Sequence, residues 1–341
     1  MKGKKGMDGE IKVSVICWVY NHEKFLERCL DGFVNQKTDF KYEVLIHDDA
    51  STDNSKQIIE KYYSNYPDII VPIYEEKNQF LNHDKVEENI RKMAKGKYHA
   101  YCEGDDYWSD ENKLQRQFDY MEKNQECSIC THNTVIRDLC NKEKDTLFNN
   151  WKDIHEMTEE EVFIDWKVHF SSFFIRKEAD IKPEFAKKYW FGDFIKLTMA
   201  YNFGKVMVLP DIMSVYNNNN IKGITKQIYK SSIEKKIEKI EKRIKYLKDY
   251  NEFTNKKYND IILKSISEIE LEIKLEKLEY IEKRKEYYEL RKSILKDEYY
   301  KEYLNKCVPK KKTKIKLITL NYLMLRLIER NKKRSKNVWM K

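Results

Sequence analysis

The stretch Tyr42-Glu-Val-Leu-Ile-His-Asp-Asp-Ala-Ser-Thr-Asp53 joins a short apolar run to an acidic, hydroxyl-rich turn. The run predicts a buried β-strand over residues 42–47, and the turn contains residue types that cap the N-termini of helices. Ile58, Ile59 and Tyr62 follow at helical spacing, so we expect a helix directly after the turn. The rest of the fold is predicted by working outward from this strand–turn–helix unit.

Similar strand and helix patterns lie on both sides of this unit. We expect further strands over residues 12–17, 69–74 and 98–102, and helices over 23–33 and 86–93. Alternating strands and helices indicate the α/β class, with a mostly parallel sheet flanked by helices. Since ligands of such sheets bind beyond the carboxyl ends of the strands, the turns after Cys17, His47 and Cys102 are the expected site.

The next hundred residues predict a less regular mixture of elements. Helices are expected over 113–121 and 194–201, and strands over 130–136, 169–175 and 205–209. Pro210 is expected to end the last of these strands, because proline has no N–H to donate to a sheet.

The composition changes sharply near residue 226. Residues 226–341 contain 34 Lys and Arg against 18 Asp and Glu, while the whole chain has a net charge of +9, so residues 1–225 are net acidic. Isoleucine and leucine recur at four- and three-residue steps over 233–247, and isoleucine again over 262–273, which is typical of coiled-coil seams. Two such seams separated by a polar stretch predict a helical hairpin, which could also pair between two copies of the chain.

We therefore expect three parts: an α/β domain over 1–225, a helical hairpin over 226–309 and a basic amphipathic tail over 310–341. The tail holds 12 Lys and Arg and one acidic residue, Glu329, around an interrupted apolar stretch. A helix lying on an anionic membrane surface and a helix packed on the body of the protein are the alternatives for it. Nucleic acid is disfavoured as a partner, because the tail has few aromatic residues for stacking.

Several features predict a cytoplasmic location, with the tail as a peripheral contact to the inner face of the cell membrane. The N-terminus has no apolar segment typical of a secretory signal, and no apolar run is long enough to span a bilayer. The seven cysteines are scattered and odd in number, which is typical of reduced thiols.

Acidic clusters follow two of the predicted strands. Glu103-Gly-Asp-Asp-Tyr-Trp108 comes directly after the strand ending at Cys102, and its carboxylates suit a Mg²⁺ or Mn²⁺ ion that bridges to phosphates. Asp48 and Asp49 begin the turn after His47, where a carboxylate could accept a hydrogen bond from the N3–H of a uracil ring. Taken alone, each cluster could also be a surface turn or a helix cap.

The order of these segments resembles the inverting family 2 glycosyltransferases. The segment 13–26, which begins Val-Ser-Val-Ile, is similar to the opening of that family, and 43–53 is similar to its second strand and D-D-G-S-T-D turn. Glu103-Gly-Asp-Asp106 resembles the metal-binding D-x-D-D motif. The following Tyr107–Gln117 is similar to the subgroup with E-G-D-D-Y-W and K-L-x-x-Q, of the bacterial surface-glycan type. The resemblance covers roughly residues 12–225.

This resemblance implies a GT-A fold and a set of site residues. It places the nucleotide against Val19, Tyr20, Asn21, Asp49 and Asp105, with Glu23 nearby. It makes Asp106 the ligand of a Mn²⁺ or Mg²⁺ ion, with Glu103 at the first position of the motif. Trp18, Val19 and Ala50 depart from the usual Pro, Thr and Gly, so we expect an altered base pocket.

The resemblance also implies a general base at the start of a later helix. Phe191-Gly-Asp193 fits that position, and a helix N-terminus favours the ionised carboxylate that a base requires. Met213-Ser-Val-Tyr216 resembles a segment that closes over the diphosphate, but Asn217–Asn220 replace the basic residues that normally follow it.

The activity implied is metal-dependent transfer, with inversion, of a sugar from a nucleotide-diphosphate donor, with UDP expected, to a hydroxyl of a glycan or lipid-linked acceptor. A surface-polysaccharide role follows from the same resemblance. The alternatives are a nucleotidyltransferase and a catalytically degenerate scaffold that binds nucleotide sugars.

Two further features give weaker evidence for a functional site. Cys127 and Cys130 with His132 lack the second ligand pair that a structural zinc site requires. His169-Phe-Ser-Ser172 falls where the family places acceptor-side residues, but packing within a strand is the favoured interpretation.

Overall fold

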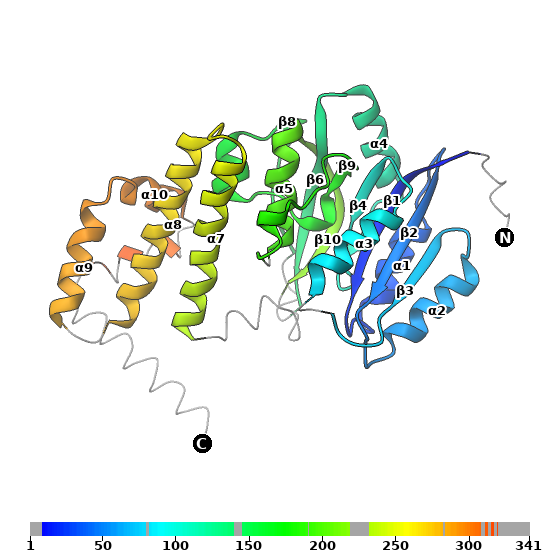
Figure 1. The fold of residues 1–341 in the computed structure, drawn as a ribbon, viewed down its shortest axis with the longest axis horizontal. Coiled ribbons are helices and arrows are strands. Elements are labelled where there is room, and N and C mark those ends of the chain that lie inside the picture. Colours follow the sequence, from blue (N-terminus) through cyan, green and yellow to red (C-terminus); the bar gives the residue numbers. More distant parts are fainter. Residues whose placement is uncertain are drawn as a thin grey trace, which may run out of the picture. The chain divides into compact units, whose positions relative to one another are not determined.

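The computed structural model describes residues 9–79, 82–139, 145–189, 191–218, 232–281 and 284–307, together with 311, 312, 315, 316 and 319. The chain divides into two compact units, residues 1–226 and 227–341 (Figure 1).

The first unit is built on one ten-stranded sheet. Its main path has the order β3-β2-β1-β4-β9-β6-β10-β5, while β7 pairs with β6 and β8 with β10. The strands are β1 (Ile11–Val19), β2 (Lys41–Asp48), β3 (Ile70–Tyr74), β4 (Tyr98–Tyr101), β5 (Tyr107–Trp108), β6 (Cys127–Asp138), β7 (Thr146–Leu147), β8 (His155–Glu156), β9 (Phe174–Arg176) and β10 (Lys205–Asn218). β1 pairs in parallel with both β2 and β4, so the carboxyl ends of these three strands are neighbours.

Helices pack around this sheet (Figure 1). They are α1 (Leu26–Val34), α2 (Ser55–Asn65), α3 (His83–Met93), α4 (Lys113–Lys123) and α5 (Gly192–Phe203). α1 shows why they form, since its buried Leu26, Leu30 and Phe33 recur every three to four residues and turn one apolar face to the core. The core also contains Val15 of β1 and Val44 of β2, both fully buried.

Two predicted strand boundaries were wrong. Residues 170–172 form a 3₁₀ turn, because the backbone N–H of Ser171 donates to His169 Nδ1 and caps it, so only Phe174–Arg176 remain as β9. β10 continues through Pro210 to Asn218, because a register shift between Leu209 and Ile212 places the proline in a bulge.

The second unit is helical. α7 (Ile233–Phe253) and α8 (Asn259–Tyr280) pack on each other, and α9 (Arg284–Lys296) and α10 (Tyr300–Lys306) follow. A buried cluster that includes Leu271, Leu278 and Ile294 joins α8 to α9. The predicted class, a mostly parallel α/β sheet with a helical C-terminal region, is confirmed. The predicted tail over 310–341 lies almost entirely outside the described residues.

Within the described part of the chain, every helix is too short or too polar to cross a lipid bilayer.

Candidate active site

Loops from three neighbouring strands meet at the carboxyl edge of the sheet. The N–H of Gly104, after β4, donates to Trp18 O of β1 at 2.9 Å, and the N–H of Asp49, after β2, donates to Val19 O at 2.9 Å. Gly104 allows this approach, because a Cβ there would lie only 2.8 Å from His22 Nδ1. The three turns singled out in the sequence therefore adjoin one another.

Glu103, Asp105 and Asp106 form a compact carboxylate cluster in the loop after β4. One oxygen from each side chain lies within 4.8 Å of the others. Asp106 is buried at 2% exposure, and burial together with repulsion from its two neighbours raises its pKa well above the ordinary value. Desolvation, and then the charges of Asp105 and Asp193, raise the pKa of Glu103 to about 8, although part of its surface stays open to solvent. The repulsion among these carboxylates is of the kind that a bound cation relieves.

The end of β10 holds this loop in place. The backbone N–H of Asn217 donates to Asp106 Oδ1 at 2.8 Å, and its Nδ2 donates to Asp105 O at 2.6 Å. Asn217 thus anchors the acid loop at the position where the resemblance leads us to expect a basic residue. Of the asparagine run, only Asn217 and Asn218 lie within the described residues.

Two histidines flank the carboxylates. His22 Nε2 lies 4.0 Å from Asp105 Oδ2, and His169 Nε2 lies 3.8 Å from Asp106 Oδ2. The sequence analysis did not single out His22, and it favoured strand packing for His169. The signal for His22 is its place in the turn after the first strand, but His169 reaches the cluster only through the 3₁₀ turn that the sequence did not predict.

Asp193 lies in the first turn of α5 and interacts electrostatically with Glu103. Its Oδ1 accepts from the N–H of Phe194 at 2.9 Å, and its charge helps to raise the pKa of Glu103. Because such an effect weakens with distance, the carboxyl of Asp193 lies near the acid cluster.

The predicted nucleotide-binding residues occupy varied environments. Asn21 Oδ1 accepts from the N–H of Thr52 at 2.8 Å, and Glu23 Oε2 accepts from Asn54 Nδ2 at 2.9 Å. Asn21 and Glu23 therefore brace the first loop against the second. Val19 is buried, whereas Tyr20 is exposed.

Asp49 is braced in a similar way. Its Oδ1 accepts from the N–H of Gln79, and its Oδ2 accepts from Asn78 Nδ2 at 2.8 Å. The predicted contacts of these residues with a nucleotide stay predictions.

Motif residues after the acid loop brace the segment that carries His169. Trp108 Nε1 donates to Ser171 O at 3.0 Å, and Gln117 Nε2 donates to Ser172 O at 2.9 Å. Lys113 is fully buried against the ring of Trp108, where desolvation lowers its pKa to about 7. The motif therefore connects the acid loop to the 3₁₀ turn through the core.

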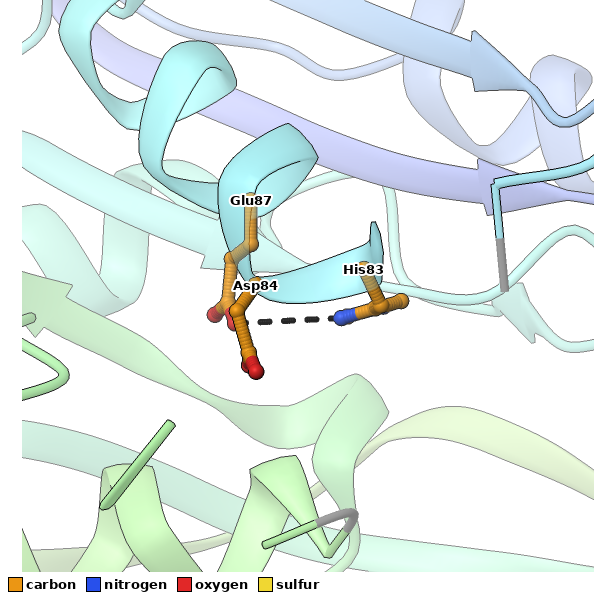
Figure 2. Close-up of side chains that lie close together, drawn as sticks. All are labelled: His83, Asp84 and Glu87. Carbon is orange, nitrogen blue, oxygen red and sulfur yellow. Dashed lines mark ion pairs between the residues drawn. The ribbon is translucent and has the colours of Figure 1, made fainter. Parts of the chain in front are cut away.

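A second cluster, His83, Asp84 and Glu87, lies at the start of α3, where His83 and Glu87 face each other across the first turn (Figure 2). Its atoms are close enough to hold a cation, but Lys196 and Lys182 Nζ already lie 2.5 and 3.8 Å from the carboxylate oxygens of Glu87. These positive charges oppose a further cation, so we interpret this cluster as an internal ion-pair network.

Residues 14–182 match the family model described as Glycosyl transferase family 2. The uncharacterized protein Rv1520 of Mycobacterium tuberculosis is 39% identical over 120 residues, which are 35% of this chain and 34% of that protein. A poly(ribitol-phosphate) beta-glucosyltransferase of Bacillus spizizenii is 34% identical over 118 residues, which are 34% of this chain and 18% of that enzyme. The chain thus matches about a third of the length of the first relative and less of the second.

Solved structures resemble the fold. S. aureus TarS 1-349 in complex with UDP-GlcNAc gives a TM-score of 0.55 at 16% identity, covering 95% of this chain and 92% of that one. The mannosyltransferase PcManGT from Pyrobaculum calidifontis, in complex with GDP-Man and Mn²⁺, gives a TM-score of 0.52 at 16% identity, covering 99% of this chain and 92% of that one. These likenesses confirm the expected GT-A fold.

Proposed function

We propose that this chain transfers a sugar from a nucleotide-diphosphate donor to a hydroxyl of an acceptor, with inversion, and the match of residues 14–182 to the model described as Glycosyl transferase family 2 supports this proposal. The observation that carries the proposal is the proximity of two kinds of acid. Glu103, Asp105 and Asp106 form a cluster within 4.8 Å, and the charge of Asp193, on a separate helix, reaches Glu103. A donor with a diphosphate at the cluster would present its sugar toward Asp193.

The donor set of the cluster fits a divalent cation. It offers carboxylate oxygens, the ligands that Mg²⁺ and Mn²⁺ prefer, and its mutual repulsion is the kind that a cation relieves. We assign Asp106 and Glu103 as ligands and Asp105 to the donor's ribose. When bound, the ion would act as a Lewis acid that neutralises charge on the departing diphosphate.

The remaining steps use groups of the chain itself. Asp193 accepts the proton of the acceptor hydroxyl as that oxygen attacks the anomeric carbon. A bond forms from the acceptor oxygen to this carbon, and the bond from the carbon to the phosphate oxygen breaks. The nucleoside diphosphate leaves with the electron pair, so a single displacement inverts the configuration. The N-terminus of α5 stabilises the ionised form of Asp193 that this role requires.

The nucleotide is proposed to be UDP, held by the first two loops through Val19, Tyr20, Asn21 and Asp49, with Glu23 bracing them. The similarity to a TarS structure that contains UDP-GlcNAc supports a UDP-linked donor. The relative named poly(ribitol-phosphate) beta-glucosyltransferase supports a polymeric glycan acceptor. A cytoplasmic protein whose tail rests on the membrane stays a proposal, and removal of residues 310–341 should then abolish binding to anionic liposomes.

The test is a panel of UDP- and GDP-sugars incubated with the full chain and Mn²⁺, with the released nucleoside diphosphate measured. Slow hydrolysis of one donor, abolished by EDTA, is the expected result. Release of pyrophosphate from a nucleoside triphosphate would instead identify a nucleotidyltransferase. Donor binding without turnover, even with acceptor glycans added, would identify a degenerate scaffold.

A further inference from the structure

Arg28 is an exposed cation that lies beside the acid loop. It belongs to the first turn of α1, and its Cζ is 3.9 Å from the centroid of the Tyr107 ring. Tyr107 directly follows Asp106 in the chain and is 5% exposed, so the ring is a firm support. Contact with an aromatic ring uses the face of a guanidinium and leaves the N–H groups at its edge available as donors.

The acids next to Arg28 on α1 pair with other residues. Glu27 Oε1 lies 2.9 Å from Lys61 Nζ, and Asp31 Oδ1 accepts from the hydroxyl of Tyr62 at 2.6 Å. Asp31 could have paired with Arg28, because residues three apart are neighbours on a helix. Among the residues that the structure describes, Arg28 forms no ion pair and donates no hydrogen bond. Its guanidinium donors are therefore unused.

A second arginine contacts the same tyrosine. Arg137 Nη1 donates to the hydroxyl of Tyr107 at 2.7 Å, while its Nε and Nη2 donate to the two carboxylate oxygens of Asp145 at 3.3 and 2.8 Å. The hydrogen bond from Arg137 lowers the pKa of Asp145, and the charges of Arg137 and Arg28 lower it further. Two arginine charges thus share one carboxylate around Tyr107, which leaves the place attractive to an anion.

This place adjoins the carboxylate cluster but is separate from it. The register of the sheet pairs Arg137 of β6 with Asn217 of β10, whose N–H donates to Asp106 Oδ1. Within the described part of the chain, however, Arg28 pairs with no carboxylate of the cluster, although these acids would attract a cation within their reach. Since the donor diphosphate is assigned to the cluster, an anion at Arg28 belongs to the other substrate.

We propose that Arg28, supported by the ring of Tyr107, binds an anionic group of the acceptor glycan, either a phosphate or a carboxylate. This inference rests on the proposed function and adds the chemical class of the acceptor to it. A planar guanidinium presents pairs of N–H donors that match two oxygens of such a group, so it binds either one in a bidentate manner. A neutral hydroxyl would not compensate the positive charge around Tyr107.

The test measures the affinity of the full chain for glycerol 3-phosphate, glucuronate and neutral glycerol by ligand-observed nuclear magnetic resonance, with excess UDP and Mg²⁺ present. Arg28→Met removes the donors, and Arg28→Lys keeps the charge without the planar fork. For the anion that binds better, we expect Arg28→Met to lower the affinity about tenfold and Arg28→Lys to give an intermediate value. UDP affinity should stay unchanged. Lys41→Met is the matched control, because it removes an exposed charge at the start of β2, at the end of this strand far from Asp48.

Several results would overturn the inference. Binding of neither anion by the unmodified chain would exclude the subsite, and so would equal affinities in Arg28→Met and the unmodified chain. The same loss in Lys41→Met would show that only net charge matters. A fall in UDP affinity in Arg28→Met would assign Arg28 to the donor and not to the acceptor. If the unmodified chain binds neither UDP nor GDP with Mg²⁺, the proposed function itself fails, whereas the preceding results leave it standing.

Discussion

Lys196, which lies one helical turn after Asp193 on α5, forms a buried ion pair with Asp180, with 2.7 Å between Nζ and Oδ1. The exposed fractions of the two side chains are 4% and 0%. Lys196 Nζ also donates to the hydroxyl of Tyr101 at 3.0 Å and pairs with Glu87 of α3. The helix whose first turn carries the proposed base is thus connected by a hydrogen bond to Tyr101 at the end of β4, and the loop after β4 holds the carboxylate cluster.

We expect Lys196→Met to destabilise the protein strongly. Removing Lys196 takes from the buried carboxylates of Asp180 and Glu87 the lysine that lies nearest to both, which costs about 3–5 kcal/mol of unfolding free energy. Urea denaturation measures this loss. Lys205→Met is the control, because Lys205 pairs with Glu156 on the surface and such pairs contribute about 0–1 kcal/mol. Equal losses in the two variants would contradict the importance of the buried network.

Asp193→Asn should remove turnover and leave donor binding intact. The amide cannot accept the proton of the acceptor hydroxyl, and general bases contribute about 10²–10⁴-fold to rate. Nucleoside diphosphate release with an acceptor measures the effect, and calorimetry with UDP and Mn²⁺ measures binding. Asp119→Asn, an exposed change on α4, is the matched control. Retained turnover in Asp193→Asn would refute the base assignment.

Gly104→Ala should weaken metal-dependent nucleotide binding. The new methyl group would lie 2.8 Å from His22 Nδ1 and 3.0 Å from Val19 Cγ2, so the acid loop or the first loop must move. A shift of this size should lower UDP affinity at fixed Mn²⁺ by about tenfold. Gly192→Ala is the control, since a Cβ there meets nothing within 4 Å. Similar UDP affinities for the two alanine variants would argue against close packing of these loops.

The metal-free protein should lose stability as pH rises. The pKa of Glu103 is raised from 4.5 to about 8 in the folded state, so between these values the folded state holds a proton that the unfolded state has released. The contribution of the Glu103 carboxyl to the free energy of unfolding is therefore complete below about pH 4.5 and is lost as the pH rises through about 8. Thermal unfolding in EDTA should show that the melting temperature falls less with rising pH in Glu103→Gln than in the unmodified chain.

Mn²⁺ provides the second arm of that experiment. Because a cation favours the ionised carboxylates, it should raise the melting temperature more at about pH 8 than at about pH 6. Glu156→Gln, an exposed change on β8, should behave like the unmodified chain. A pH dependence that is identical in Glu103→Gln and the unmodified chain would refute the assignment.

The sequence predicted the strand–helix alternation of the first unit well. Its strands are apolar runs that end in recognisable turns, and β1, β2 and β4 lie within one or two residues of their expected bounds. Pro210 misled the prediction of β10, because a bulge accommodates the proline and the strand continues beyond it. The tendency of proline to end strands is a local signal, and it does not predict this bulge, which depends on the pairing of β10 with β6.

The site was predictable only in part, for a related reason. The acids of the loop after β4 stand together in the chain, so the cluster was visible in the sequence. His169 and Asn217 come to Asp106 from segments 63 and 111 residues away, as the distance in numbering shows. Their approach depends on the 3₁₀ turn and the long final strand, neither of which leaves a periodic pattern.

Gln117 Nε2 donates hydrogen bonds to the backbone carbonyl groups of Cys130 and Ser172 and not to their side chains. Every amino acid offers the same carbonyl, so these two contacts set no requirement on the side chains at positions 130 and 172, whereas position 117 needs an amide of that length. These contacts alone should therefore make position 117 less tolerant of substitution than positions 130 and 172. A library designed to change the preferred nucleotide would do best to keep residues 108 and 117 unchanged and to randomise the loop after β1.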